Sequence, residues 1–455
     1  MSEHDRDPAD AASPDTPSDG TRLPGIEARG TTPTGKVPVQ PWMAEPETQA
    51  VWAAITAGGG EARFVGGCVR NALLNRPAAD IDIATVEPPE RVIELLGAAG
   101  IRAIPTGIEH GTVTAIAGER HYEITTLRVD VETDGRHARV RFVDDWQADA
   151  ARRDFTINSL SCTPEGYIYD PFGGIDDLAH GQVRFVGLAK ERIAEDLLRV
   201  LRFFRFFAVY GRPPAGIDTL AACRAAAPRL AGLSADRVRE EMFRLLLAPN
   251  PADTILLMHG EKVLEVLLPE AGDVGRLRLV AWLETTAMNM DSIQPDALRR
   301  LAALLDTDPD GAAAVARRLN LSKVDSARLI AVTAPVFTPH ADDDGPTRRR
   351  LMQRHSAETV RDVALLTWAA ARSVAPHGQA GDTEGWQALL AETETWTPKE
   401  LPIDGDDILA LGIEAGPRIG ELLDAMTRWW EKGDFEADRD DCLATLRDLK
   451  GVAGN

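Results

Sequence analysis

The chain has 455 residues, which at roughly 150 residues per domain predicts about three domains. Its formal net charge of −21 disfavours non-specific binding to nucleic acid, although only the local charge matters at a specific binding groove. No apolar run approaches the roughly 20 residues that a membrane span needs, and the acidic first residues do not resemble a signal peptide.

The first part of the chain predicts a tail followed by mixed strands and helices. Residues 1–40 are rich in Pro, Asp, Thr and Gly, and we expect them to form a disordered tail. Apolar periodicity and Gly or Pro at the ends then predict short elements. The expected helices are 46–59, 68–75 and 88–100, and the expected strands are 62–67, 79–86, 111–118 and 120–129.

The remainder of the chain predicts mostly helix. Two further strand-bearing segments are expected at 153–162 and 165–171. Residues 190–211 carry apolar side chains at helical spacing, and we expect one helix there that ends at Gly211. Residues 251–455 predict successive amphipathic helices, with no repeat of fixed period.

Two aspartates one residue apart stand inside an apolar strand. Asp80 and Asp82 would project from the same face of the strand, about 7 Å apart, and would repel each other without a cation. A pair of Mg²⁺ ions fits such acids, because Mg²⁺ takes oxygen ligands and bridges phosphates. Glu123, on the next predicted strand, is the candidate for a third catalytic acid. The alternative is a solvated strand edge that carries two acids by chance.

A glycine pair lies between the first predicted strand and its helix. Gly66 and Gly67 would let the backbone approach a phosphate, and Arg70 on the first turn could bind a triphosphate. A dinucleotide-binding site is the competing interpretation, but the G-x-G-x-x-G pattern that it needs is absent here.

Five motifs occur in one order along the chain. They are GGCVRN, the D-x-D at Asp80 and Asp82, RRDFTINSL from 152, DPFGGIDDL from 170 and EDLLRVLRFFRF from 195. This set resembles the class II tRNA nucleotidyltransferases, which add CCA, and their bacterial poly(A) polymerase relatives. The resemblance implies an α+β nucleotidyltransferase head, a small mixed β-sheet with helices, followed by an all-α neck, body and tail. The implied boundaries are 41–185 for the head, 186–250 for the neck, 251–340 for the body and 341–455 for a tRNA-binding tail.

The resemblance also implies roles for individual residues. Asp80 and Asp82 would bind two Mg²⁺ ions. The residues implied to hold the triphosphate are Gly66, Gly67 and Arg70, and those implied to contact the ribose and phosphates are Arg153, Asp154 and Asn158. The residues implied to select the base are Glu195, Asp196 and Arg199, with Arg202 in support.

Two features qualify these assignments. A helix from about Glu191 would place Glu195, Arg199 and Arg202 on one side, but taken alone Glu195 and Arg199 could equally form an ordinary surface ion pair. Asn71 stands where the family usually has Asp, so the grip of Arg70 on a triphosphate could be weaker.

The resemblance implies template-independent addition of C, C and A to the 3′ end of tRNA, from CTP and ATP, with release of pyrophosphate. We expect neither a membrane nor DNA as a partner. The four cysteines lie far apart without a C-x-x-C pair, which favours the reducing cytoplasm. An A-adding or CC-adding specialist and a poly(A) polymerase are alternatives, although the basic Arg-Phe-Arg stretch of the poly(A) branch is missing. An alternative of another class is a non-catalytic RNA-binding protein that kept the fold.

Overall fold

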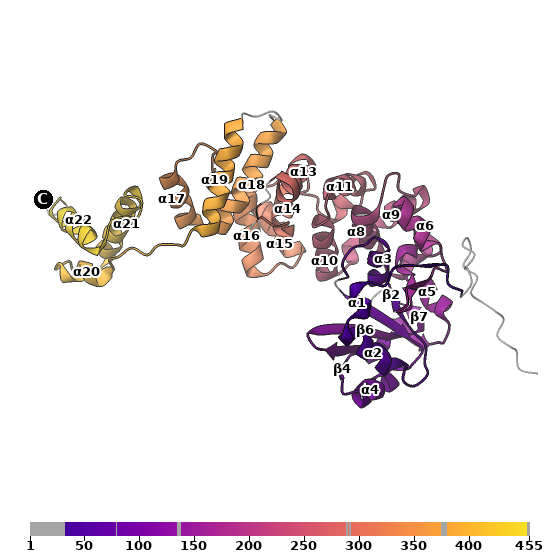
Figure 1. The fold of residues 1–455 in the computed structure, drawn as a ribbon. Helices are drawn as coiled ribbons and strands as arrows, with labels where there is room; N and C mark the ends of the chain where they lie inside the picture. The colour runs from indigo at the N-terminus through magenta and orange to yellow at the C-terminus, as the bar shows by residue number, and fades with distance from the viewer. Residues whose placement is uncertain are drawn as a thin grey trace, which may run out of the picture. The chain divides into compact units, whose positions relative to one another are not determined.

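The computed structural model describes residues 32–78, 80–133, 138–287, 290, 293–374 and 380–452. These residues form two compact units, which are described separately (Figure 1). The first comprises residues up to 199 together with 212–222, and the second comprises 200–211 and the residues from 223 onward.

The first described elements begin inside the segment that was predicted to be a disordered tail. Its first 31 residues lie outside the described residues. Strand β1 (Gly35–Lys36), however, pairs with β10 (Tyr167–Tyr169), and the Thr34 amide donates to the Ile168 carbonyl at 2.8 Å. Val37 is buried. The predicted boundary at residue 40 is therefore wrong, because an extended segment with one apolar anchor can join a sheet edge despite its Pro and Gly content.

The first unit is built on an eight-stranded sheet in the order β1-β10-β9-β2-β3-β6-β5-β4. Strands β3 and β6 are parallel, and the other neighbouring pairs are antiparallel. The mixed sheet confirms the predicted fold class. Its remaining strands are β2 (Ala62–Val65), β3 (Ile81–Thr85), β4 (Arg102–Gly107), β5 (Thr112–Ala117), β6 (Arg120–Thr126) and β9 (Ser161–Cys162).

The two faces of this sheet have different surroundings. On one face Phe64 packs against Trp42 and Trp52, within a large apolar core that also contains Ile83. Because side chains alternate along a strand, Ala84 faces the other way, into a small cluster that Trp146 partly covers. The helices of this unit are α1 (Pro41–Ala44), α2 (Pro46–Thr56), α3 (Gly67–Leu73), α4 (Pro89–Ala98), α5 (Trp146–Ala151), α6 (Gly174–His180) and α7 (Ala189–Glu195).

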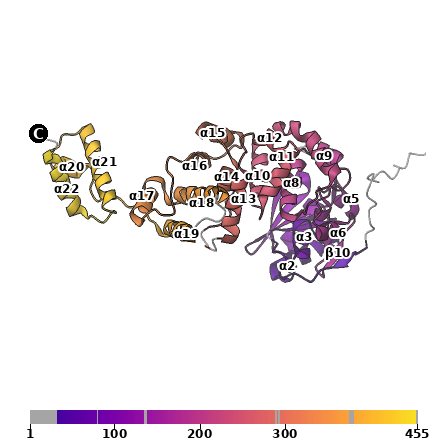
Figure 2. The ribbon, with the colours of Figure 1, turned by 90° about the horizontal axis from the view of Figure 1, so that it is seen from above.

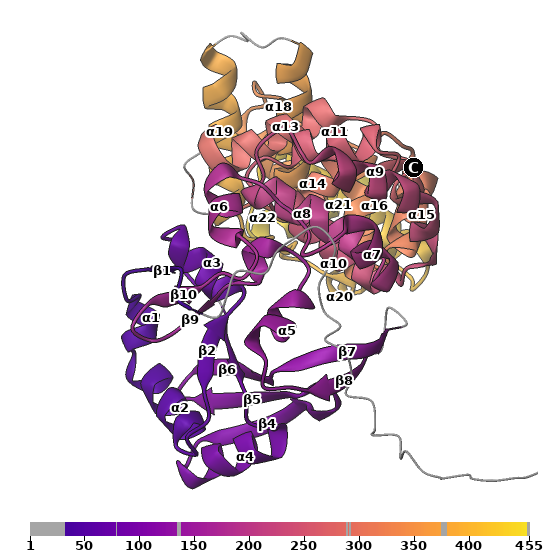
Figure 3. The ribbon, with the colours of Figure 1, turned by 90° about the vertical axis from the view of Figure 1, so that its right-hand side faces the viewer.

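A two-stranded antiparallel sheet of β7 (Arg128–Thr133) and β8 (Ala138–Phe142) lies beside the large sheet (Figure 3). Residues 134–137 lie outside the described residues.

The long helix predicted over 190–211 is interrupted. Helix α7 ends at Glu195, Asp196 has an extended backbone (φ −145°, ψ 109°), and α8 begins at Arg199 and ends at Tyr210. The Asp196 carboxylate accepts a hydrogen bond from the Leu198 amide at 3.1 Å. A short acidic side chain thus competes with the helical backbone and starts a new helix.

Helices make up the second unit. Helix α18 lies beside α13, α16 and α19 (Figure 2). The helices after α8 are α9 (Ile217–Ala226), α10 (Ala235–Leu246), α11 (Pro251–Gly260), α12 (Leu264–Leu267), α13 (Val274–Trp282), α14 (Ala297–Leu304), α15 (Pro309–Arg318), α16 (Lys323–Thr333), α17 (Gly345–His355), α18 (Ala357–Val374), α19 (Ala380–Thr395), α20 (Gly405–Ala410), α21 (Pro417–Lys432) and α22 (Arg439–Val452).

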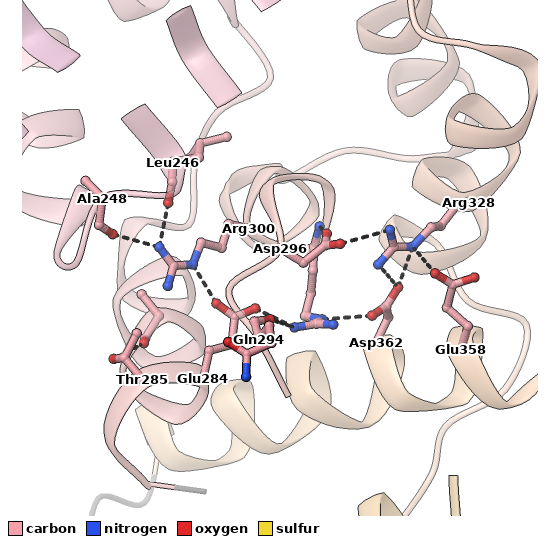
Figure 4. Close-up of polar contacts among 12 residues, drawn as sticks. Leu246, Ala248, Glu284, Thr285, Gln294, Asp296, Arg300, Arg328, Glu358 and Asp362 are labelled. Carbon is pink, nitrogen blue, oxygen red and sulfur yellow. Dashed lines mark hydrogen bonds and ion pairs between the residues drawn. The ribbon is translucent and has the colours of Figure 1, made fainter. Parts of the chain in front are cut away.

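A buried ionic network joins several of these helices (Figure 4). Arg300, with no exposed surface, donates to the Glu284 carboxylate at 2.5 Å and to the carbonyls of Leu246 and Ala248. Arg299 donates to Glu284 at 2.5 Å and to Asp362 at 2.8 Å. Because each of these charges has an opposite partner, the network can remain ionised in the interior. We call Glu284, Arg299, Arg300 and Asp362 the body network.

The four cysteines are free and buried. Burial raises the pKa of Cys68, Cys162 and Cys223 to about 12. None of the helices in the described part of the chain combines the length and apolarity that a membrane crossing requires.

Candidate active site

Two of the predicted catalytic acids face each other across neighbouring strands. In the parallel register of β3 and β6, Asp82 lies opposite Glu123, and Ile83 lies opposite Ile124. Residues in register on neighbouring strands project from the same face, so both carboxylates lie on the face away from the Phe64 core. Asp80 comes directly before β3, at the spacing that returns its side chain to this face.

The electrostatics of Asp82 reflect this crowding. Burial, followed by the negative charge of Glu123, raises the pKa of Asp82 to about 6, and Asp80 adds to the effect. The guanidinium groups of Arg153 and Arg70 oppose the shift without cancelling it. A bound cation would offset the cost of ionising Asp82 beside Glu123 and Asp80, so this group of acids is suited to bind one.

The arrangement of the acids suits a metal ion that takes part of its coordination shell from water and substrate. Among the residues that the structure describes, no three or more His, Cys, Asp or Glu side chains are gathered closely enough to enclose a metal by themselves. Mg²⁺ does not need such a cage, because it usually binds one or two carboxylates and completes its shell with water and substrate phosphates.

The glycine turn lies directly over these groups. Gly66 has φ +70° and ψ −123°, and a Cβ atom there would lie 3.3 Å from Arg153 Nη1 and 3.8 Å from Asp82 Oδ2. Only glycine adopts this backbone readily. The turn therefore brings the backbone, Asp82 and Arg153 within contact distance. A Cβ at Gly67 would meet Arg70 at 3.6 Å, an ordinary contact distance.

A buried hydrogen-bond chain links the residues predicted to hold the triphosphate and the ribose. Arg70 Nη1 donates to Asn158 Oδ1 at 2.5 Å, and Asn158 Nδ2 donates to Asp154 Oδ1 at 3.0 Å. Arg70 also donates to the Asn71 side-chain oxygen at 3.3 Å. Asn71 therefore keeps a bond to Arg70, but this bond lacks the strength that a charged acceptor would give.

Asp149 is a further site residue that sequence reasoning missed. It is buried on α5 and accepts from Arg152 at 2.8 Å and from Arg153 at 3.1 Å. Burial alone would raise the pKa of Asp149, but Arg153 and Arg152 outweigh burial and lower it. In the sequence, Asp149 precedes Arg152 by three residues and Arg153 by four, a spacing that could have predicted these ion pairs.

The start of α5 is fixed to the sheet by an aromatic sandwich. The Arg63 guanidinium lies 4.2 Å from the Trp146 ring centroid and 3.5 Å from that of Tyr169. Trp146 also donates to Glu61 at 3.0 Å. These contacts hold the helix that leads into Arg152 and Arg153.

The residues predicted to select the base form a cluster at the break between α7 and α8. Arg199 donates to Glu195 Oε2 at 2.5 Å, and its side chain is only 12% exposed. Arg192, which sequence reasoning also missed, donates to the same oxygen at 2.5 Å. In the described part of the chain Glu195 Oε1 accepts no hydrogen bond, while Asp196 caps the turn. Glu195 and Arg199 are in contact across the interruption of the helix.

Arg202 has a different environment. Its guanidinium lies 3.5 Å from Glu241 on α10 and 5.6 Å from the Phe206 ring centroid. These contacts belong to the second unit, so its predicted support of the base-selecting residues stays a prediction.

Comparison with known proteins identifies the family of the chain. Residues 62–184 match the family described as the poly A polymerase head domain, and residues 217–273 match the "Probable RNA and SrmB- binding site of polymerase A". The first unit thus has the head of a nucleotidyltransferase.

Relatives that match most of the chain show which family of nucleotidyltransferases it belongs to. The human CCA tRNA nucleotidyltransferase 1, mitochondrial, is 34% identical over 396 residues, which is 85% of this chain and 86% of that protein. The Geobacillus stearothermophilus CCA-adding enzyme is 34% identical over 397 residues, 85% of this chain and 93% of the enzyme. The crystal structure of the Bacillus stearothermophilus CCA-adding enzyme in complex with CTP superposes with a TM-score of 0.72 at 28% identity, covering 90% of this chain and 99% of that one. The chain belongs to the family of CCA tRNA nucleotidyltransferases.

Proposed function

We propose that this protein adds C, C and A to the 3′ end of tRNA, from CTP and ATP, without a nucleic-acid template and with release of pyrophosphate. Family membership over 85% of the chain supports the reaction, and the related structure bound to CTP supports the nucleotide. The observation that carries the proposal is the position of Asp82 and Glu123 side by side beneath the Gly66 turn, next to Arg153.

Asp80 and Asp82 would hold two Mg²⁺ ions, since the raised pKa of Asp82 indicates a cluster with excess negative charge. Bound there, the metal would lower the pKa of the attacking hydroxyl and neutralise charge on the phosphates. Glu123, the neighbour of Asp82, would complete the acidic group.

The phosphates and ribose would be held by groups on three segments. Gly66 and Gly67 would expose backbone to the triphosphate, and Arg70 would donate to it. Arg153, Asp154 and Asn158 would contact the ribose and phosphates. The hydrogen bonds from Arg70 to Asn158 and from Asn158 to Asp154 favour this grouping, because they fix the three side chains in one arrangement.

Glu195, Asp196 and Arg199 would select the base. Cytosine and adenine both offer an amino group beside a ring nitrogen that accepts. A carboxylate and a guanidinium match that pattern, whereas uracil and guanine reverse it at the same edge. With both arginines on Oε2, Glu195 keeps Oε1 available to accept from an amino group.

The site assignment is tested by Asp80→Ala. Asp80 is exposed, so its loss should leave the fold intact while removing one metal-binding carboxylate. We expect incorporation to fall by at least about a thousandfold, with tRNA affinity in a filter-binding assay unchanged. Glu119→Ala, an exposed acid in the turn between β5 and β6, is the control. Near-normal turnover of the Asp80 variant would remove the metal assignment.

The activity itself is tested with tRNA lacking its 3′ terminus, Mg²⁺, and labelled CTP or ATP supplied singly and together. Two additions with CTP and one more after ATP support the proposal. Addition of only one kind of nucleotide would identify an A-adding or CC-adding specialist, and a long A product would identify a poly(A) polymerase. Incorporation of neither would favour a non-catalytic RNA-binding protein.

We further propose the predicted roles of the four regions: a catalytic head at 41–185, a base-recognising neck at 186–250, a body at 251–340 and a tRNA-binding tail at 341–455.

A cytoplasmic location is also part of the proposal. Since the human relative is named as mitochondrial, cell fractionation is the direct test.

A further inference from the structure

Arg192 connects two groups of functional residues in the first unit. It is 6% exposed, on α7. One end of its guanidinium donates to Glu195 Oε2 at 2.5 Å. The other end donates to the carbonyl of Arg153 at 2.8 Å and to that of Arg152. One planar group therefore contacts both the base-selecting carboxylate and the backbone that carries the phosphate-contacting arginine.

Arg199 closes the arrangement from the other side. It donates to the Arg192 carbonyl at 2.8 Å and to the same Glu195 oxygen. Glu195 is thus fixed through Oε2 alone, by two guanidinium groups. A carboxylate held in this way keeps one rotamer, which is what discrimination between donor and acceptor patterns requires.

The chemistry of arginine suits this connection. Its guanidinium presents several donors in a rigid fork, so it can hold a carboxylate and two carbonyls at fixed relative positions. Lysine presents a compact point charge on a flexible stem and cannot reproduce the fork. Among the described residues, all the acceptors of Arg192 lie on two segments, Glu195 and the backbone of residues 152 and 153, and both segments are proposed to bind the same nucleotide. A purely space-filling arginine would not require this arrangement.

We infer that Arg192 is a positioning residue that sets the distance between the base-reading carboxylate of Glu195 and the phosphate-contacting Arg153. This inference rests on the proposed function. Arg192 is assigned no direct contact with the base or the phosphates. It acts through Glu195 and through the backbone of residues 152 and 153.

The test compares Arg192→Gln and Arg192→Lys with Arg244→Gln. Arg244 forms an ion pair with Glu240 at 2.5 Å. This distance equals that between Arg192 and Glu195, but the Arg244 pair is exposed and belongs to the second unit. We expect Arg192→Gln to reduce the preference for CTP over UTP, measured as the ratio of kcat/KM values, by at least about tenfold. KM for CTP should rise more than kcat falls. The Lys variant should be intermediate, and Arg244→Gln should behave as the wild type.

A double-mutant cycle separates positioning from a general loss of stability. Because Arg192 acts on selectivity through Glu195, Arg192→Lys combined with Glu195→Gln should discriminate no worse than Glu195→Gln alone. Additive losses, or unchanged selectivity in a folded Arg192→Lys protein, would overturn the inference. Failure of the wild type to incorporate CTP would instead overturn the proposed function, so the two results are distinguishable.

Discussion

At Asp82, burial and neighbouring acids make the charged carboxylate unfavourable in the folded protein. Its pKa of about 6 lies above the ordinary value of 3.8, so the folded state binds the proton more tightly than the unfolded state does. Ionisation therefore destabilises the fold above about pH 6, and this cost is progressively relieved as the pH falls from there toward the ordinary pKa.

This linkage predicts how Mg²⁺ stabilises the protein. Since Mg²⁺ competes with the proton for Asp82, the rise in Tm on adding Mg²⁺ should be larger at about pH 7.5 than at about pH 5. Asp82→Asn should raise the Tm of the metal-free protein at the higher pH and diminish the Mg²⁺ effect. Asp253→Asn, in an exposed pair with Arg278, is the control. Equal Mg²⁺ shifts at both pH values would contradict the metal role of Asp82.

Single residues differ in how far the sequence reveals them. Glu123 was predictable because its alternation with Ile124 fixes the face of its strand. Asp149 was missed although its spacing to Arg153 was visible, because a helical Asp–Arg pair is common on protein surfaces. Arg192 gave no signal for its contacts with the carbonyls of residues 152 and 153, which lie about forty positions earlier. Such contacts depend on the tertiary fold.

Among the elements, the turn between β2 and α3 gives a direct mutational test. Gly66→Ala would place a side chain on a backbone with positive φ, at a cost of about 1–3 kcal/mol, and would displace Arg153 by a few tenths of an ångström. We expect a lower Tm and a lower kcat/KM for CTP. Gly97→Ala is the matched control, because Gly97 lies in α4 with open space around it, and this change should be neutral or stabilising. Full activity of the Gly66 variant would contradict the close approach.

The body network predicts a large loss of stability when one charge is removed without a change in side-chain volume. Glu284→Gln keeps the side-chain volume but leaves the buried Arg299 and Arg300 with one negative partner fewer. Removing one member of a buried ion pair costs about 3–5 kcal/mol, so the midpoint of chemical unfolding should fall clearly. The exposed Glu240→Gln should change it little. Equal midpoints for the two variants would show that the network contributes no net stability.

The elements also show where sequence patterns stop being informative. Helices α2, α3 and α4 and strands β2, β3, β5 and β6 lie where the apolar periodicities predict them, whereas the edge strand β4 and helices α5 and α6 were not predicted. The helix over 190–211 was predicted as continuous, since apolar spacing persists on both sides of Asp196 and no Gly or Pro interrupts it. The break depends on the Asp196 carboxylate, which accepts a hydrogen bond from a backbone amide. The amino-acid composition does not predict whether an Asp forms such a bond.

On the scale of the whole molecule, the net charge of −21 opposes the approach of RNA, so tRNA binding must depend on local basic groups. Two arginines of α17 are already engaged, Arg349 with Asp434 and Arg354 with Glu431.

A consequence is a strong dependence of tRNA affinity on salt. Between about 50 and 200 mM KCl we expect the Kd to rise at least tenfold, because each phosphate contact releases counterions. Titrations by filter binding at several salt concentrations measure the slope. A DNA hairpin of the same sequence is the control for RNA-specific contacts, and a flat response would mean that phosphates contribute little.

All four native thiols are enclosed, and those of Cys68, Cys162 and Cys223 are held in the unreactive protonated form. A maleimide dye should therefore modify only a cysteine introduced at the surface, for example Val336→Cys at a position that is 89% exposed. Fluorescent reporters can then be attached to the otherwise native chain, and movements during successive additions can be followed without first building a cysteine-free background.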